Sequence, residues 1–196
     1  MVGVGPTGLD AARSLGYGGY EVHRAEAARE LGGRVAREAR LPGLAEWGRV
    51  RDWRVGQINK MNNVAIYMDS VLTAQDVLDF GADHVLLSTG CHWRRDGFGR
   101  SNGMGIKGFD ETSIFTPDDI MDGRLPPGPV VRFDDDNFYY ASHIADKLSG
   151  EGRALIYVTR DDTPASWSTS TLNDHHHQHP HPHRHAHGRD DARSLV

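Results

Sequence analysis

Three glycines near the amino end of the chain, Gly3, Gly5 and Gly8, have the spacing G-x-G-x-x-G. Between a strand and a helix, glycines at this spacing permit a tight turn, a close approach of the backbone to a pyrophosphate, and close packing of the helix on the strand. Pro6 suits the first helical position, where a backbone N–H is not needed, and Thr7 follows it. The N–H groups and the positive dipole end of that helix would then face the phosphates of a bound dinucleotide.

Further candidates for nucleotide binding follow at suitable distances. Glu26 stands 18 residues after Gly8, close to the distance of roughly 20 residues at which an acid binds a ribose hydroxyl. Taken singly, each candidate has a plainer interpretation, such as a solvated acid at a strand end or an ordinary glycine turn, but their order and spacing favour a nucleotide. The predicted cofactor-binding residues are Gly3, Gly5, Pro6, Thr7, Gly8, Glu26, Gly33, Arg34, Thr89 and Gly90.

Apolar periodicity and turn residues predict the elements that hold these groups. The helix that begins at Pro6 has an apolar stripe and ends at the glycines of 16–19. Only Met1 and Val2 precede Gly3, so the strand that feeds the turn is cut short and the chain is expected to be a piece of a longer protein. Strands are expected over 20–25, 64–68 and 83–90, the last of them buried, and helices after Arg34 and over 49–59 and 73–80.

A second, similar unit is expected from Thr116 onward, with helices over 117–121 and 137–148 and strands over 130–133 and 154–158. The fold class is therefore predicted as α/β, a three-layer Rossmann-like fold truncated in its first strand. Residues 1–125 would form an adenine-dinucleotide-binding domain, 126–172 a partial second Rossmann-like unit, and 173–196 a histidine-rich tail. Residues 175–187 contain no apolar side chain larger than alanine and cannot build a core, so the tail is expected to be disordered.

The second unit has no glycine fingerprint after its first strand. Asp134, Asp135 and Asp136 stand where a pyrophosphate would bind. Two like charges about 4 Å apart repel by about 4 kcal/mol at an effective dielectric constant near 20, so the loop is expected to reject NAD(P)H. Alternatively, the three acids only cap the following helix, whose N-terminus favours negative charge.

Composition excludes several classes of function. The net charge of −5 argues against nucleic acid or an anionic membrane as a partner. The single cysteine, Cys91, rules out an internal disulfide or a cysteine-built cluster within these residues, and it fits a reducing, cytoplasmic setting. No catalytic residue and no metal site is predicted. The histidines of 175–187 could chelate metals loosely, but the abrupt change of composition favours a frameshift or read-through product.

Five short segments carry a family resemblance: LPGLAEW at 41–47, RDWR at 51–54, LTAQDVL at 72–78, FGAD at 80–83 and LSTGCHW at 87–93. In this order they resemble the C-terminal half of the trimethylamine, dimethylamine and histamine dehydrogenases and of related demethylating oxidoreductases of the old-yellow-enzyme type. The resemblance implies that this part holds ADP or FAD. It also implies an N-terminal barrel with FMN and a [4Fe-4S] cluster, none of whose residues occurs in this chain.

The resemblance carries further expectations about function. Electrons would pass to a protein acceptor such as an electron-transferring flavoprotein, the full-length protein would be a homodimer, and this chain alone would be inactive. Three alternatives remain open at this point. They are an NAD(P)H-dependent flavin reductase of the dienoyl-CoA reductase type, an ADP-binding structural module, and an inactive gene remnant.

Overall fold

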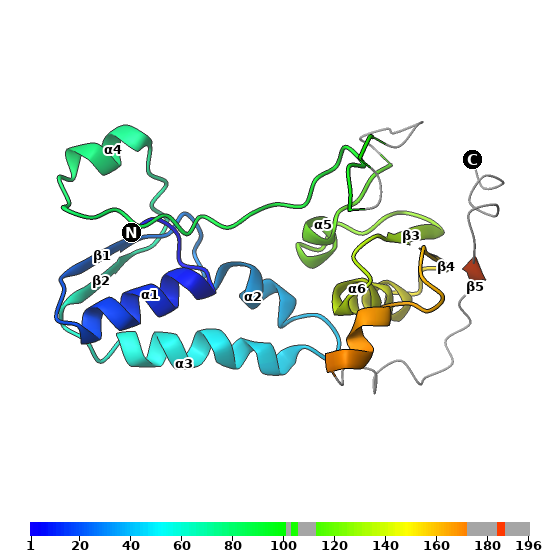
Figure 1. The fold of residues 1–196 in the computed structure, drawn as a ribbon, viewed down its shortest axis with the longest axis horizontal. Helices are drawn as coiled ribbons and strands as arrows, with labels where there is room; N and C mark the ends of the chain where they lie inside the picture. The colour runs from blue at the N-terminus through cyan, green and yellow to red at the C-terminus, as the bar shows by residue number, and fades with distance from the viewer. Residues whose placement is uncertain (101–102, 106–112, 172–183, 187–196) are drawn as a thin grey trace. The chain divides into compact units, whose positions relative to one another are not determined.

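The computed structural model describes residues 1–100, 103–105, 113–171 and 184–186, and its chain divides into two compact units (Figure 1). The amino-terminal unit comprises Met1–Arg40 and Leu44–Cys91, and the carboxy-terminal unit comprises Leu41–Gly43 and His92–Val196. The domain boundary expected at 125 stays a prediction, although residues 92–125 group with the carboxy-terminal unit, and one residue of this stretch with contacts there is Arg95. Its guanidinium pairs with Asp119 and donates to the carbonyl of Ile114.

The sheet of the amino-terminal unit is built from parallel strands. Strand β1 (Val22–Ala25) pairs along its whole length with β2 (Val64–Tyr67). On the other side of β1, Val2 forms one parallel bridge to Ala25 and a second to Leu87. The order across the sheet is therefore β2, β1, the segment at Val2, and the segment at Leu87. The predicted α/β class with parallel strands is confirmed in this unit.

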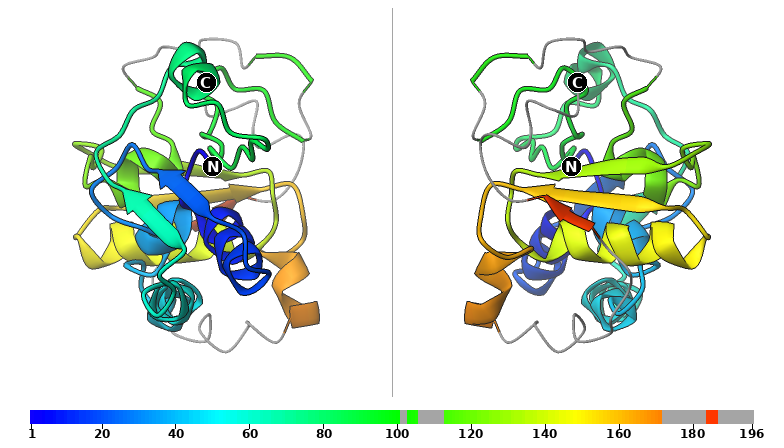
Figure 2. Two further views of the ribbon diagram at one scale, coloured as in Figure 1. Left: turned by 90° about the vertical axis from the view of Figure 1, so that its left-hand side faces the viewer. Right: turned by 90° about the vertical axis from the view of Figure 1, so that its right-hand side faces the viewer.

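Two long helices cover one face of this sheet. Helix α1 (Pro6–Tyr17) and helix α3 (Gly48–Ile58) lie side by side against β1 and β2 (Figure 2). Shorter elements follow the turns, namely α2 (Gly33–Glu38), the 3-10 turn η1 (Ala45–Trp47) and α4 (Ala74–Asp79). Burial of apolar side chains between helices and sheet stabilises this arrangement. The centre of that core consists of Val4, Leu9, Ala12, Val22 and Ile58.

The prediction of a buried strand over 83–90 is wrong, because the segment forms no extended strand and two of its apolar side chains are exposed. Within it only Leu87 forms a bridge, and the side chains of Val85 and Leu87 are 47% and 73% exposed. The backbone of this segment bonds to Val2, whose N–H donates to the carbonyl of Leu86 and whose carbonyl accepts from the N–H of Ser88. An apolar run is buried only where neighbouring elements cover it, and here only the short segment at Val2 lies alongside.

The carboxy-terminal unit contains a second parallel sheet, in the order β3 (Val130–Asp134), β4 (Leu155–Thr159) and β5 (Arg184–Ala186). Helix α6 (Tyr139–Gly150) packs on β3 and β4, as Figure 2 shows, with buried residues along its inner face. The short helix α5 (Pro117–Met121) begins at a capping box, as Thr116 predicts. A 3-10 turn, η2 (Ser166–Thr171), follows β4.

The histidine-rich tail falls largely outside the described residues. Within it the structure describes Arg184–Ala186 as β5, parallel to β4, where disorder was expected. Backbone hydrogen bonds hold an edge strand, so large apolar side chains are not required for this pairing. In the described part of the chain, no helix combines the length and the hydropathy needed to cross a bilayer.

Candidate functional site

Gly3 and Gly8 hold the glycine turn together because neither position has room for a side chain. Gly3 has a φ of +92°, and a Cβ there would lie 2.4 Å from the carbonyl oxygen of Ser88. A Cβ on Gly8 would lie 2.4 Å from the carbonyl oxygen of Gly3 and 2.5 Å from Ser88 Oγ. The start of α1 is therefore pressed closely against the segment 86–88, as the first and third glycines of the fingerprint require.

Gly5 differs from the other two because it faces open space. It is the N-cap of α1, with φ −68°, and an added Cβ would meet no described atom within 4 Å. Since Gly5 has no side chain, it cannot cap the N–H groups at the start of α1, where Thr7 is exposed and Gly8 is buried. Gly33, with φ +52°, approaches from α2, and its Cβ would lie 3.1 Å from Gly5 Cα. We call Gly5, Thr7, Gly8 and Gly33 the glycine mouth.

Glu26 follows the carboxyl end of β1, and its carboxylate holds the glycine turn through the backbone of Val4. Its Oε2 accepts a hydrogen bond of 2.7 Å from the backbone N–H of Val4, and its Oε1 accepts one of 3.0 Å from that of Ala28. A carboxylate oxygen has two lone pairs, so each can accept one further bond. The geometry is thus compatible with the predicted ribose contact, and it adds a structural role that the sequence did not indicate.

Arg34 and the pair Thr89 and Gly90 complete the surroundings of the turn. The guanidinium of Arg34 donates to the carbonyl of Cys91 at 2.7 Å. Thr89 and Gly90 therefore lie between Ser88, which contacts the glycine turn, and Cys91, which is held by α2. Both are exposed, and Gly90 has a φ of +76°. The structure accordingly brings the predicted residues around one turn, with Pro6 at the start of α1.

Ser88 supports the glycine turn through hydrogen bonds, a role that the sequence did not specify. Its hydroxyl donates to the carbonyl of Gly3 at 2.8 Å and lies 3.2 Å from that of Val2. A serine at the end of an apolar run has many roles, so no local signal distinguishes this one. The hydroxyl fixes the carbonyl of Gly3 and thereby the path of the chain into Gly5.

Arg24 is the second residue that sequence reasoning missed. Its side chain is fully buried in β1, and none of its guanidinium nitrogens has a hydrogen-bond partner among the residues that the structure describes. Burial lowers the pKa of Arg24 to about 10, although the charge of Glu26 acts in the opposite direction. An arginine in a strand is usually exposed, so no feature of the sequence indicates a buried cation here.

The acidic loop of the carboxy-terminal unit is bound to itself. The buried carboxylate of Asp134 accepts bonds from the backbone N–H groups of Asp136 and Asn137, at 3.2 and 3.0 Å, and from the hydroxyl of Tyr157 at 2.7 Å. Burial, with the charge of Asp134 next, raises the pKa of Asp136. Burial likewise raises the pKa of Tyr157, and its bond to Asp134 adds to this. The loop N–H groups therefore already have an anionic partner in the protein.

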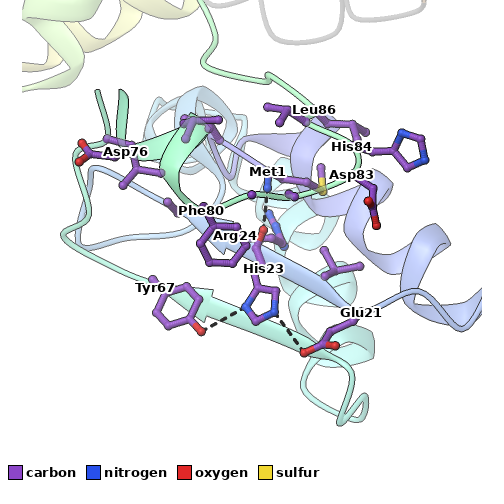
Figure 3. Close-up of a pocket in the computed structure, with 18 of the residues that line it drawn as sticks. Met1, Glu21, His23, Arg24, Tyr67, Asp76, Phe80, Asp83, His84 and Leu86 are labelled. Carbon is purple, nitrogen blue, oxygen red and sulfur yellow. Dashed lines mark hydrogen bonds and ion pairs between the residues drawn. The ribbon is translucent and has the colours of Figure 1, made fainter. Parts of the chain in front are cut away.

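A cavity of about 740 Å³ lies away from the glycine mouth, between β1, α4 and the segment 83–86 (Figure 3). Its lining is apolar for the most part, and Met1, His23 and Arg24 line one side of it. Figure 3 shows the Met1 amino group bonded to the carbonyl of His23, at 2.6 Å. None of the predicted nucleotide-binding residues lines this cavity.

Metal binding was not expected, and its absence stays a prediction. Within residues 1–100, 103–105, 113–171 and 184–186, no three or more His, Cys, Asp or Glu side chains are grouped as metal ligands. The histidines of 175–187 lie outside the described residues, apart from the backbone of Arg184–Ala186.

Comparison with known proteins identifies relatives of this chain, although no protein-family model matches it. The chain is 32% identical over 168 residues to dimethylamine dehydrogenase of Hyphomicrobium sp. (strain x), and the match covers 81% of this chain and 23% of that protein. The solved 6-hydroxypseudooxynicotine amine oxidase of Pseudomonas geniculata N1 matches 90% of this chain and 26% of its own, with 47% identity and a TM-score of 0.86. Histamine dehydrogenase of Rhizobium sp. 4-9 matches 87% of this chain and 25% of its own, with 46% identity and a TM-score of 0.83. The chain spans about a quarter of the length of these relatives. It is homologous to the segment that it matches in the dimethylamine and histamine dehydrogenases.

Proposed function

We propose that this chain is the adenine-nucleotide-binding segment of a flavin-dependent, amine dehydrogenase-type oxidoreductase, where it holds ADP or the ADP part of FAD. The open glycine mouth is the observation that carries the proposal. Gly5 has free space on its Cβ side, whereas Gly3 and Gly8 have none. An open glycine between two closed ones is the arrangement that lets a pyrophosphate approach the backbone.

The charges around the mouth suit a nucleotide. The N–H groups of Thr7 and Gly8 and the positive end of α1 would bind the pyrophosphate. Glu26, held by Val4 and Ala28, has acceptor capacity left for the ribose hydroxyls. Arg34, held at the carbonyl of Cys91, would add a positive charge at the rim of the mouth.

The variant Gly5→Ala tests this assignment. Its methyl group meets no described protein atom within 4 Å, and its φ of −68° suits alanine, so the stability of the protein should fall by no more than about 1 kcal/mol, the cost of alanine at an N-cap. A methyl group between the backbone and a pyrophosphate should cost about 1–3 kcal/mol of binding, roughly a 5- to 150-fold rise in Kd for ADP. Isothermal titration calorimetry with ADP measures this.

The matched control is Gly56→Ala, which also enters open space but lies within α3, away from the mouth. We expect this control to bind ADP as the unmodified chain does. An equal loss of affinity in both variants, or no ADP binding by the unmodified chain, would refute the assignment.

The alternative of an NAD(P)H-dependent reductase is disfavoured by the acidic loop. Asp134 already occupies the N–H groups of Asp136 and Asn137, which a dinucleotide phosphate would need. We therefore propose that this unit does not bind NAD(P)H and that electrons pass to a protein acceptor such as an electron-transferring flavoprotein. A fluorescence titration with NADH that gave a micromolar Kd would contradict this proposal.

The identity of the nucleotide follows from one further measurement. Purified protein is denatured by heat, and the released nucleotide is identified by chromatography. Yellow protein that releases FAD supports the flavin form of the site, and colourless protein that releases ADP supports a structural nucleotide. If neither nucleotide is released and the calorimeter shows no ADP binding, the gene-remnant alternative is left.

We place the full-length protein in the cytoplasm, as a homodimer.

A further inference from the structure

Three side chains with complementary chemistry meet on the face of the amino-terminal sheet that points away from the core. Val22 belongs to the buried core cluster, and because side chains alternate along a strand, His23 points to the opposite face. Tyr67 of β2 pairs with Ala25 of β1, so its side chain lies on the same face as that of His23. Glu21 precedes His23 by two residues. A carboxylate, an imidazole and a phenol therefore lie close together.

The three side chains form one hydrogen-bonded row, with His23 in the middle, as Figure 3 shows. The phenol oxygen of Tyr67 lies 3.2 Å from His23 Nδ1, and Glu21 Oε1 lies 3.2 Å from His23 Nε2. The rings of His23 and Tyr67 are nearly parallel, with 12° between their planes. The ring of Phe80 lies edge-on to that of His23, with the centroids 5.1 Å apart. These contacts fix the orientation of the imidazole.

The carboxylate of Glu21 determines which nitrogen of His23 carries the proton. An ionised carboxylate can only accept a hydrogen bond, so the neutral imidazole must donate to it through Nε2–H. Nδ1 is then left as the acceptor, and the phenol O–H of Tyr67 donates to it. A hydroxyl nucleophile bonded to a base, with the base oriented by a third group, is the arrangement that activates such nucleophiles in enzymes.

Tyr17 in the same unit offers a direct comparison with Tyr67. Its hydroxyl also has an acceptor at 3.2 Å, the side-chain oxygen Oε1 of Gln57. An amide oxygen accepts a hydrogen bond but does not take up a proton near neutral pH, whereas an imidazole does. Tyr17 is 65% exposed and Tyr67 48%, so a reactant in solution reaches both. Tyr67 should therefore be the more reactive phenol although it is the less exposed one.

We propose that Tyr67 is an acyl-acceptor site, a tyrosine nucleophile with His23 as its general base and Glu21 as the residue that positions His23. The phenol oxygen attacks the carbonyl carbon of an activated acyl group, such as a thioester or an aryl ester. As the new C–O bond forms, the phenol proton passes to His23 Nδ1. The bond between the carbonyl carbon and the leaving group then breaks, and the leaving group takes up this proton. The products are O-acyl-tyrosine at position 67 and a free thiol or phenol.

The experiment treats the 196-residue chain with p-nitrophenyl acetate at neutral pH. Peptide mass spectra taken over time give the rate of acetylation at each tyrosine. We expect Tyr67 to be acetylated at least roughly tenfold faster than Tyr17, since general-base assistance typically contributes a factor of about 10²–10⁴. Acetylation of Tyr67 that was no faster than that of Tyr17 would overturn the proposal, and this comparison within one chain requires no variant.

Two variants assign the roles of base and positioning residue. His23→Gln gives Tyr67 the same kind of acceptor that Tyr17 has, so the acetylation of Tyr67 should fall to the level of Tyr17. Glu21→Leu should slow Tyr67 by a smaller factor, because it frees the imidazole to turn without removing the base. The Glu21 side chain is 80% exposed, so this variant should fold.

The rate at Tyr17, read from the same samples, is the control for folding and for the reagent, and it should stay unchanged in both variants. Acetylation of Tyr67 at the parent's rate in either variant would overturn the proposal. Loss of ADP binding has no bearing on it, because Glu21, His23 and Tyr67 are not part of the glycine mouth.

Discussion

Replacing the buried Arg24 by methionine should stabilise the protein, because a methionine retains the unbranched stem and removes the charge. Burial lowers the pKa of Arg24 from its ordinary value to about 10. At about 1.4 kcal/mol per pKa unit, a fall of roughly two to three units means that the charged form costs the folded protein about 3 kcal/mol. Arg24→Met should therefore raise the free energy of unfolding by about 3 kcal/mol at pH 7. The melting temperature should rise by roughly 6–12 °C for a chain of this length.

The pH dependence gives this prediction a second test. The pKa of Arg24 is lower in the folded state than in the unfolded one, so the cost is fully present below pH 10. This cost should shrink as the pH rises above about 10, toward the ordinary pKa of an arginine. Urea unfolding followed by tryptophan fluorescence, at pH 7 and again at pH 10.5, measures the free energy of unfolding of variant and parent. The difference between these two free energies should be smaller at the higher pH.

Arg29→Met is the matched control, since the Arg29 side chain is 89% exposed and pairs with Asp69 at the surface. Its effect should stay within about 0.5 kcal/mol, as is usual for an exposed ion pair. If Arg24→Met were less stable than the parent, or if the control gained as much, the argument from an unpartnered buried charge would be refuted.

Two further variants test local geometry. Gly8→Ala should destabilise the protein by about 1–3 kcal/mol, because the new Cβ would lie 2.4 Å from the carbonyl oxygen of Gly3. The urea concentration at the midpoint of unfolding should therefore be lower than for Gly5→Ala, whose methyl group has free space. Equal midpoints for the two variants would contradict this prediction. Burial raises the pKa of Asp119, but bonds from the Thr116 backbone and Arg95 outweigh it, so the pKa lies below the usual 3.8. Asp119→Asn should thus lower the free energy of unfolding by about 1–2 kcal/mol at pH 7. The difference between parent and variant should vanish as the pH falls through the lowered pKa. Thermal melts from pH 7 to pH 2.5 in which the two melting temperatures kept a constant difference would contradict this prediction.

Steric rules made the glycine turn predictable from sequence. Only glycine fits at Gly3 and Gly8, and a proline that follows the second glycine of the motif begins a helix. The structure has α1 begin at Pro6 and places β1 and β2 within one or two residues of the expected strands. These features depend on local backbone geometry, which neighbouring residues largely determine.

Features that depend on distant neighbours were not predictable. The apolar run at 83–90 resembles a buried strand, but its exposure depends on how much chain lies beside it, and its one described β-bridge is with Val2. The burial of Arg24 depends likewise on residues that are distant from it in the sequence, since its side chain is fully buried although it is charged. The acids of the loop after β3 were expected to repel phosphates, but the contacts of Asp134 with two loop N–H groups and Tyr157 appear only in three dimensions.

The bond between Arg34 and the carbonyl of Cys91 has a practical consequence. Cys91 is the single cysteine of the chain and its thiol side is exposed. A maleimide dye would attach at this one position without any mutagenesis, close to the arginine that borders the glycine mouth. Its emission could then report, in real time and in the natural sequence, whether a nucleotide enters or leaves.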